Sequence, residues 1–192
     1  MRLNIGSHNV RVKDFLNVDI FKLPEVDIVC DITQTPWNFH YVKEDIHEFP
    51  YKDTVDEMLM VEVLEHISFH DTMKVLKEIH RVLVPGGKIH IQVPDCGSMM
   101  EMYVKEQISA AVPHKPKSEQ EVLDIYAKTG MRVNPMRWLM AFCGAQKYGV
   151  PDIHKNIFTK EILQVQLEDA GFSRIDFKDD PLGWKIKCNA TK

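Results

Sequence analysis

The chain has 192 residues, of which 44% are hydrophobic, and its formal net charge at pH 7 is −4. A chain of this length buries one sizeable core and is too short for two comfortable domains, so we expect one domain over residues 1–192. Its lysines and arginines are scattered and form no basic stripe, so we expect no nucleic-acid partner and no membrane partner.

The cysteines indicate a reducing environment. They are widely spaced, contain no CxxC pair and accompany no signal peptide, and they stand at Cys30, Cys96, Cys143 and Cys188. No apolar run approaches the roughly 20 residues that a membrane-spanning helix needs. We therefore expect a soluble, cytoplasmic protein.

The first two predicted strands place a glycine and a carboxylate at strand ends. Gly6 follows a short strand at Arg2–Ile5, and a glycine there lets the backbone approach a ligand closely. The next apolar run, residues 15–20, puts Asp19 where a second parallel strand delivers a carboxylate to a ribose diol. The gap between the strands is shorter than the roughly 10–12 residues that a crossover helix needs, so we predict a loop.

A third apolar strand is predicted at residues 26–30, and Asp31 follows it directly. Two similar sequence patterns then occur, in each of which an acidic residue precedes a proline and an aromatic residue. They begin at Asp31 and Asp45. Either carboxylate is a candidate for binding the adenine of a ligand. Asp31 is favoured because the strand before it is more apolar.

The stretch from Glu62 to Asp95 predicts a β-α-β unit. Ser68, with an acidic residue three positions later, predicts a helix N-cap, and Pro85-Gly86-Gly87 is expected to end the helix. Strands joined by one helix lie parallel, and ligands of such sheets bind beyond the carboxyl ends of the strands. Glu62 and Asp95, which follow two of these strands, are therefore candidate site residues.

Residues 96–158 form an irregular excursion on the ligand side of the predicted sheet, where lids and substrate walls are common. A helix is predicted at residues 119–128 within it. His154, near its end, is a candidate base, because a neutral imidazole removes a proton from a hydroxyl near pH 7. The alternative is that His154 belongs to a simple helix-entry loop.

The C-terminal part predicts a helix followed by a β-hairpin. Thr159 caps the helix, and Gly171 closes it. The expected buried face consists of Ile162, Leu163, Leu167 and Ala170. Alternating strands are predicted at residues 172–177 and 184–188.

Several of these segments together resemble the motifs of class I S-adenosylmethionine-dependent methyltransferases, and most closely the type-11-like predicted methyltransferases. They are Leu3-Asn4-Ile5-Gly6-Ser7, Asn17-Val18-Asp19-Ile20, Glu62-Val63-Leu64-Glu65-His66, Arg81-Val82-Leu83-Val84-Pro85-Gly86-Gly87, Val93-Pro94-Asp95 and Ala170-Gly171-Phe172. The resemblance implies an α/β fold, a three-layer Rossmann-like methyltransferase sandwich. Its seven-stranded sheet would be mostly parallel and would end in an antiparallel hairpin.

The resemblance also implies S-adenosylmethionine as the cofactor and methyl transfer to oxygen or nitrogen of a small-molecule or sugar (glycan) acceptor. Its cofactor-binding positions here would be Asn4, Gly6, Ser7, Asp19, Asp31 or Asp45, Met60, Val61 and Glu62. Asp19 would bind the ribose hydroxyls, and Asp31 or Asp45 the adenine amino group. The catalytic candidates are His154, Glu62 and Asp95.

Two positions depart from the family pattern. His8 stands where a second glycine is usual, and Asn4 stands where the family carries an acid. They leave open an alternative to the methyltransferase, namely a degenerate cofactor-binding or non-catalytic interaction module on the same fold. A nicotinamide-dependent oxidoreductase is disfavoured because no GxGxxG follows the first strand.

The cluster Glu62-x-x-Glu65-His66 resembles the ExxEH cluster that some O-methyltransferases use for a divalent metal. We expect no metal here, and Glu65 and His66 would then order the loop by hydrogen bonds. The alternative is a cation held by Glu62, Glu65 and His66, whose spacing allows the three side chains to converge.

Overall fold

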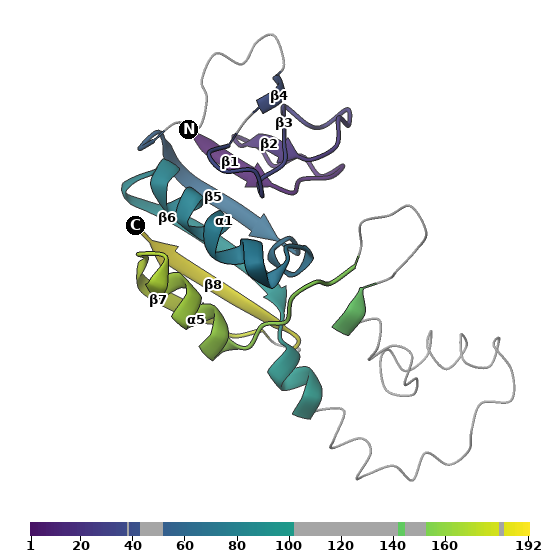
Figure 1. The fold of residues 1–192 in the computed structure, drawn as a ribbon, viewed down its shortest axis with the longest axis vertical. Helices are drawn as coiled ribbons and strands as arrows, with labels where there is room; N and C mark the ends of the chain where they lie inside the picture. The colour runs from purple at the N-terminus through teal and green to yellow at the C-terminus, as the bar shows by residue number, and fades with distance from the viewer. Residues whose placement is uncertain (38, 43–51, 102–141, 145–152, 181–182) are drawn as a thin grey trace, which may run out of the picture.

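The computed structural model describes residues 1–37, 39–42, 52–101, 142–144, 153–180 and 183–192. Its centre is an eight-stranded sheet with the order β4-β3-β2-β1-β5-β6-β8-β7 (Figure 1). The strands are β1 Arg2–Ile5, β2 Leu16–Asp19, β3 Ile28–Cys30, β4 Phe39–Val42, β5 Val55–Val61, β6 Leu83–Pro94, β7 Ser173–Lys178 and β8 Lys185–Thr191.

The middle of the sheet is parallel. β1 pairs in parallel with β2 and β5, β2 pairs in parallel with β3, and β5 does so with β6. These strands therefore end at one edge of the sheet, where a ligand site is expected. The predicted hairpin is present as antiparallel β7 and β8. The predicted Rossmann-like α/β fold is confirmed, with β4 as an additional antiparallel edge strand.

Helix α1, Phe69–Val82, forms at the predicted place, but its ends differ from the prediction. At the start, Ser68 Oγ donates to Asp71 Oδ2 at 2.7 Å and does not cap a backbone N–H. At the other end the helix stops at Val82, before Pro85-Gly86-Gly87. The glycines instead lie within β6, where the pairing with β5 shifts register, so they form a bulge and not the helix stop.

Helix α5, Lys160–Asp169, begins as predicted, because Thr159 Oγ1 accepts a hydrogen bond from Ile162 N at 3.3 Å. Leu163 and Leu167 are fully buried, whereas Ile162 is 39% exposed and does not belong to the buried face. Both α1 and α5 cover the same face of the sheet (Figure 1). The connections after β1 and β2 are loops, so in the described part of the chain they add no helices to the other face of the expected three-layer sandwich.

The core fills the space between the sheet and these helices. Its largest fully buried side chains include Leu3, Met58, Leu76, Ile79, Ile89 and Phe158. The helix predicted at residues 119–128 lies outside the described residues. Within the described ranges, no helix has the length and apolar composition required to cross a membrane.

Candidate functional site

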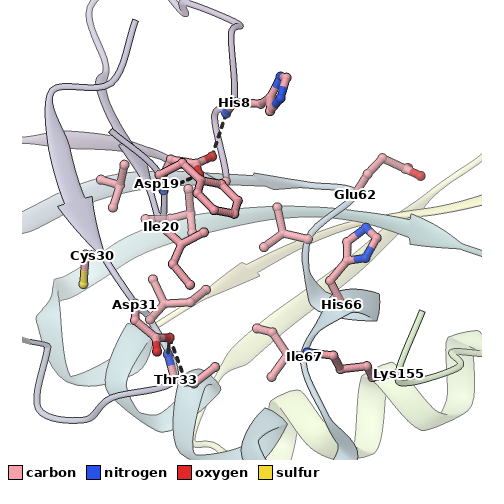
Figure 2. Close-up of a pocket in the computed structure, with 16 residues that line it drawn as sticks. His8, Asp19, Ile20, Cys30, Asp31, Thr33, Glu62, His66, Ile67 and Lys155 are labelled. Carbon is pink, nitrogen blue, oxygen red and sulfur yellow. Dashed lines mark hydrogen bonds between the residues drawn. The ribbon is translucent and has the colours of Figure 1, made fainter. Parts of the chain in front are cut away.

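A pocket of about 370 Å³ lies at the carboxyl ends of β1, β2, β3 and β5 (Figure 2). Asp19 and Asp31 lie on one side of it, and Glu62 and His66 on the other. The complete lining is Ile5, Gly6, His8, Val18, Asp19, Ile20, Phe21, Cys30, Asp31, Ile32, Thr33, Glu62, Val63, His66, Ile67 and Lys155. The volume is within the roughly 300–1,000 Å³ that is usual for small-molecule and cofactor sites.

Gly6 is required at the end of β1 for two reasons. Its φ is +66°, in the left-handed region that favours glycine, and a Cβ there would meet Val63 Cγ2 at 2.3 Å. Gly6 N and Ser7 N both donate to Val18 O, at 2.8 and 3.1 Å, which closes the turn against β2. The Ser7 hydroxyl is buried and has no hydrogen-bond partner among the described residues, although it does not line the pocket.

His8 occupies the second glycine position of the motif and adopts a positive φ of 45°. Its backbone N–H donates to Asp19 Oδ2 at 2.8 Å. Its ring is exposed and points away from Asp19 and Asp31 (Figure 2). His8 nevertheless belongs to the pocket lining, together with Ile5 and Gly6.

Asn4 lies beneath this loop and outside the pocket lining. Its Nδ2 donates to Asn17 Oδ1 at 3.0 Å and to Val10 O at 3.4 Å. Asn4 thus ties β1 to β2 and to the loop between them. Asn4 therefore stabilises the loop beside the pocket and does not line the pocket itself.

Asp19 is nearly buried, and its carboxylate is held in place by two backbone N–H groups. Oδ2 accepts from His8 N, and Oδ1 accepts from Phe21 N at 3.0 Å. A carboxylate oxygen has two lone-pair sites, so each oxygen retains one acceptor position after these bonds. The orientation of Asp19 is therefore fixed while it can still accept from a ligand hydroxyl.

Asp31, directly after β3, also lines the pocket, and its carboxylate stabilises the following turn through hydrogen bonds. Oδ1 accepts from Thr33 N at 3.0 Å and from Thr33 Oγ1 at 2.7 Å. Asp45, the alternative adenine-side residue, lies outside the described residues. The structure thus places Asp31 at the pocket.

Glu62 lines the opposite side with a positive φ of 55°. Its Oε1 accepts from Gln92 Nε2 at 3.1 Å and lies 3.2 Å from Lys185 Nζ. Its neighbours face elsewhere: Met60 is fully buried in the core, Val61 is 46% exposed, and neither lines the pocket.

A cluster of Glu65, His66 and His154 lies beside this wall. Each of the three offers a ligand atom, and these atoms lie within 4.8 Å of one another. The rings of His66 and His154 meet edge to face, with centroids 5.1 Å apart. The sequence offered Glu62, Glu65 and His66 as the alternative of a cation site, but it gave no signal that His154 lies beside Glu65 and His66.

Asp95 was a candidate catalytic residue, but its carboxylate is hydrogen-bonded to Ser98 outside the pocket lining. Its Oδ1 accepts from Ser98 N at 3.0 Å and its Oδ2 from Ser98 Oγ at 2.9 Å. This is the pattern of an N-cap, and a helical segment begins at Cys96. Asp95 is buried and does not line the pocket.

Several pocket residues were not singled out from the sequence. Ile20 and Phe21 are 54% and 46% exposed, large apolar side chains at the pocket rim. Their position directly after Asp19 was the available signal. Cys30 lines the floor, and burial raises the pKa of its thiol to about 12, so it stays protonated and is a poor nucleophile near neutral pH.

Comparisons with known proteins agree with this fold. Residues 9–91 match the model of a family described as a methyltransferase domain. The chain is similar to the 1,6-didemethyltoxoflavin-N1-methyltransferase of Burkholderia thailandensis, solved with S-adenosylhomocysteine (14% identity, TM-score 0.54, 100% of this chain and 70% of that one). It is also similar to human N-acetylserotonin methyltransferase in complex with SAM (13% identity, TM-score 0.52, 100% of this chain and 47% of that one).

A protein from Pyrococcus horikoshii OT3 is another structural neighbour (13% identity, TM-score 0.55, 99% of this chain and 80% of that one). The chain spans only 40% to 51% of the length of several other structures that it matches. No curated protein matches its sequence. At these identities the structural likeness establishes the fold.

Proposed function

We propose that the chain is an S-adenosylmethionine-dependent methyltransferase, which binds S-adenosylmethionine and transfers the methyl group to an acceptor. The observation that carries the proposal is the pocket itself, in which the Gly6 turn and the fixed Asp19 carboxylate meet at the ends of β1 and β2. The match of residues 9–91 to a methyltransferase domain supports it independently.

The adenosine part of the cofactor would lie on the side formed by Asp19 and Asp31. Ribose hydroxyls are donors, and Asp19 retains an acceptor position on each oxygen. The adenine amino group is also a donor, and Asp31 offers it a carboxylate at the next strand end. The exposed apolar side chains of Ile20 and Phe21 would cover the adenine ring, which is apolar on its faces.

The methyl group would face the side formed by Glu62 and His66. The bound cofactor would supply an electrophilic methyl group to the acceptor's lone pair, and the electron pair of the broken carbon–sulfur bond would stay on sulfur. A positive sulfonium is already a good leaving group, so the protein mainly positions the reactants. While no cation occupies these residues, the proton of an oxygen or nitrogen acceptor can pass to an imidazole of the His66 and His154 pair.

The acceptor would approach from the side where the 96–158 segment returns to the sheet. Lys155 N and Asn156 N both donate to Glu65 O, at 2.7 and 3.1 Å, and Lys155 lines the pocket. We assign residues 153–158 to the acceptor wall of a single domain, while most of the predicted excursion 96–158 lies outside the described residues. The small molecules in the names of the Burkholderia and human methyltransferases support a small-molecule acceptor, with a sugar as the further candidate.

Calorimetric titration with S-adenosylhomocysteine and S-adenosylmethionine tests the proposal, with NAD⁺ as a control ligand. We expect one cofactor per chain and no NAD⁺ binding. Absence of binding at about millimolar cofactor, which corresponds to about 4 kcal/mol of binding free energy, would refute the proposal. Binding without methyl transfer to any member of an acceptor library would favour the non-catalytic module.

A further inference from the structure

We propose that Glu65, His66 and His154 bind a divalent transition-metal ion beside the cofactor pocket. One carboxylate and two imidazoles place their donor atoms within 4.8 Å of one another. Donors about 2.0–2.2 Å from a common cation stand about 3–4 Å apart, so modest side-chain rotations complete the site. This ligand set differs from the alternative of Glu62, Glu65 and His66 in the sequence.

Glu62 does not belong to the set because its carboxylate is directed elsewhere. Oε1 of Glu62 accepts from Gln92 Nε2 at 3.1 Å and lies 3.2 Å from Lys185 Nζ. These contacts hold the carboxylate toward β6 and β8, and they neutralise its charge locally. His154 supplies the third ligand instead, from a remote part of the chain.

The backbone around the cluster holds the donors in place. Glu65 and His66 belong to the 3-10 turn η1, Leu64–His66, directly after β5. His154 N donates to Cys143 O at 3.1 Å, and the two residues after it donate to Glu65 O. Asn156 Nδ2 adds a buried bond to Thr72 Oγ1 at 3.0 Å. These hydrogen bonds thus hold the segment that carries His154 against η1 and α1.

The tautomer of His66 also suits a metal ligand. Its Nδ1 lies 3.2 Å from the carbonyl oxygen of Ile153, which can only accept, so Nδ1 carries the proton and Nε2 offers a lone pair. A histidine ligand normally makes such an outer hydrogen bond through its other nitrogen. Imidazole ligands suit ions such as Zn²⁺, Cu²⁺, Fe²⁺ or Ni²⁺, whereas Mg²⁺, Ca²⁺ and Mn²⁺ prefer oxygen ligands.

Three protein ligands leave at least one coordination position open. Because His66 lines the cofactor pocket, the open coordination position of the cation would lie next to the acceptor end of that pocket. An acceptor that offers an oxygen or nitrogen lone pair would be oriented there. This role rests on the proposed methyl transfer, whereas binding of the cation does not.

The test is calorimetric titration of the metal-stripped chain with Zn²⁺, Mn²⁺ and Mg²⁺, in the absence of cofactor. We expect one high-affinity Zn²⁺ site, with affinity in the order Zn²⁺, Mn²⁺, Mg²⁺. His66→Gln and His154→Gln should each weaken Zn²⁺ binding by at least about ten-fold, and the absorption of bound Co²⁺ should change in both variants.

Two control variants define the ligand set. His70→Gln changes an exposed histidine near the cluster in sequence, and Glu62→Gln changes the carboxylate that the structure directs elsewhere. Both should bind Zn²⁺ like the wild type. Unchanged binding in the His66 and His154 variants, or no wild-type binding at about 1 mM Zn²⁺, would overturn the inference. Loss of binding in Glu62→Gln with a folded chain would also overturn this ligand set.

Circular dichroism of each variant separates loss of a ligand from loss of the fold. Cofactor titrations are run separately on the wild type. A chain that binds Zn²⁺ but no S-adenosylhomocysteine would contradict the proposed function and leave the metal site standing. The reverse result would contradict only the metal site.

Discussion

The backbone N–H of Trp37 donates to Oε1 of Glu78 at 2.8 Å, and this buried bond joins the loop after β3 to helix α1. Arg81 holds the same carboxylate through two bonds of 2.7 Å. Trp37 Nε1 in turn donates to Ile32 O at 3.1 Å. Because Ile32 and its neighbours line the pocket, Glu78 positions the proposed adenine-side wall without touching a ligand.

Glu78→Ala should weaken S-adenosylhomocysteine binding by about ten-fold and lower the free energy of unfolding by about 1–3 kcal/mol, because it leaves the Trp37 N–H buried without its acceptor. Glu78→Gln keeps an acceptor oxygen and should restore most of the affinity. Calorimetry and urea unfolding give the two quantities.

The matched control is Asp71→Ala, which removes another carboxylate of α1, one bonded to Lys74 and Ser68 at the surface. Exposed pairs contribute about 0–1 kcal/mol, so affinity should be unchanged and stability nearly so. Equal cofactor affinity in Glu78→Ala and the wild type would show that the Trp37 bond does not position the pocket.

The same pair gives a prediction for pH. Hydrogen bonds from Arg81 hold the pKa of the Glu78 carboxyl below its usual value. A carboxyl with a lower pKa in the folded state adds stability above its unfolded pKa of about 4.3, and this contribution is lost as pH falls through the folded pKa. The unfolding free energy of the wild type minus that of Glu78→Gln should therefore be larger at pH 7 than near pH 3.5.

Urea unfolding of both proteins at the two pH values measures that difference. Other carboxylates with lowered pKa values, such as Asp53 and Asp180, are present in both proteins and cancel in the subtraction. A difference that is constant, or that grows on the acid side, would contradict the assignment of the Glu78–Arg81 pair.

Local patterns in the sequence were sufficient to predict the central strands and the strand-end residues on one side of the pocket. Gly6, Asp19 and Asp31 each follow an apolar run directly, and the ends of parallel strands meet at one sheet edge. The part that could not be predicted depends on distant pairing. His154 meets His66, and Trp37 meets Glu78, only because the tertiary fold brings those segments together.

Two local predictions were also overridden by packing. Pro85-Gly86-Gly87 has the composition of a helix stop, yet β6 pairs with β5 from Leu83 onward and takes the glycines into a bulge. Asp95 follows a strand like the other site acids, but the helical segment that starts immediately after it uses its carboxylate as an N-cap. Position at a strand end thus does not by itself place a side chain in the pocket.

Asp19→Asn should weaken S-adenosylhomocysteine binding by about 10- to 100-fold, because hydrogen bonds to a charged group contribute about 1.5–3 kcal/mol and the amide loses both the charge and one acceptor oxygen. Calorimetry measures the affinity. The bonds from His8 N and Phe21 N are also weakened, so unfolding is measured in parallel. Tight binding retained by a folded Asp19→Asn would contradict the ribose assignment.

Gly6→Ala should abolish detectable cofactor binding and destabilise the chain by about 1–3 kcal/mol, because the new Cβ meets Val63 Cγ2 and the backbone is left-handed. A second substitution that removes the contact with Val63 separates the effect of the steric clash from that of the left-handed backbone. In Gly6→Ala combined with Val63→Ala the methyl group has room, but the φ of +66° remains, so stability should recover only in part.

Val63→Ala alone is the control for the double variant, since Val63 lines the pocket and its loss has an effect of its own. Urea unfolding of the four proteins gives the coupling between the two positions, and a clash predicts a favourable coupling of about 1 kcal/mol or more. Additive effects would mean that the backbone at Gly6 moves away from Val63 when a side chain is added. Full cofactor affinity in Gly6→Ala would show that the pocket does not need the close approach of this turn.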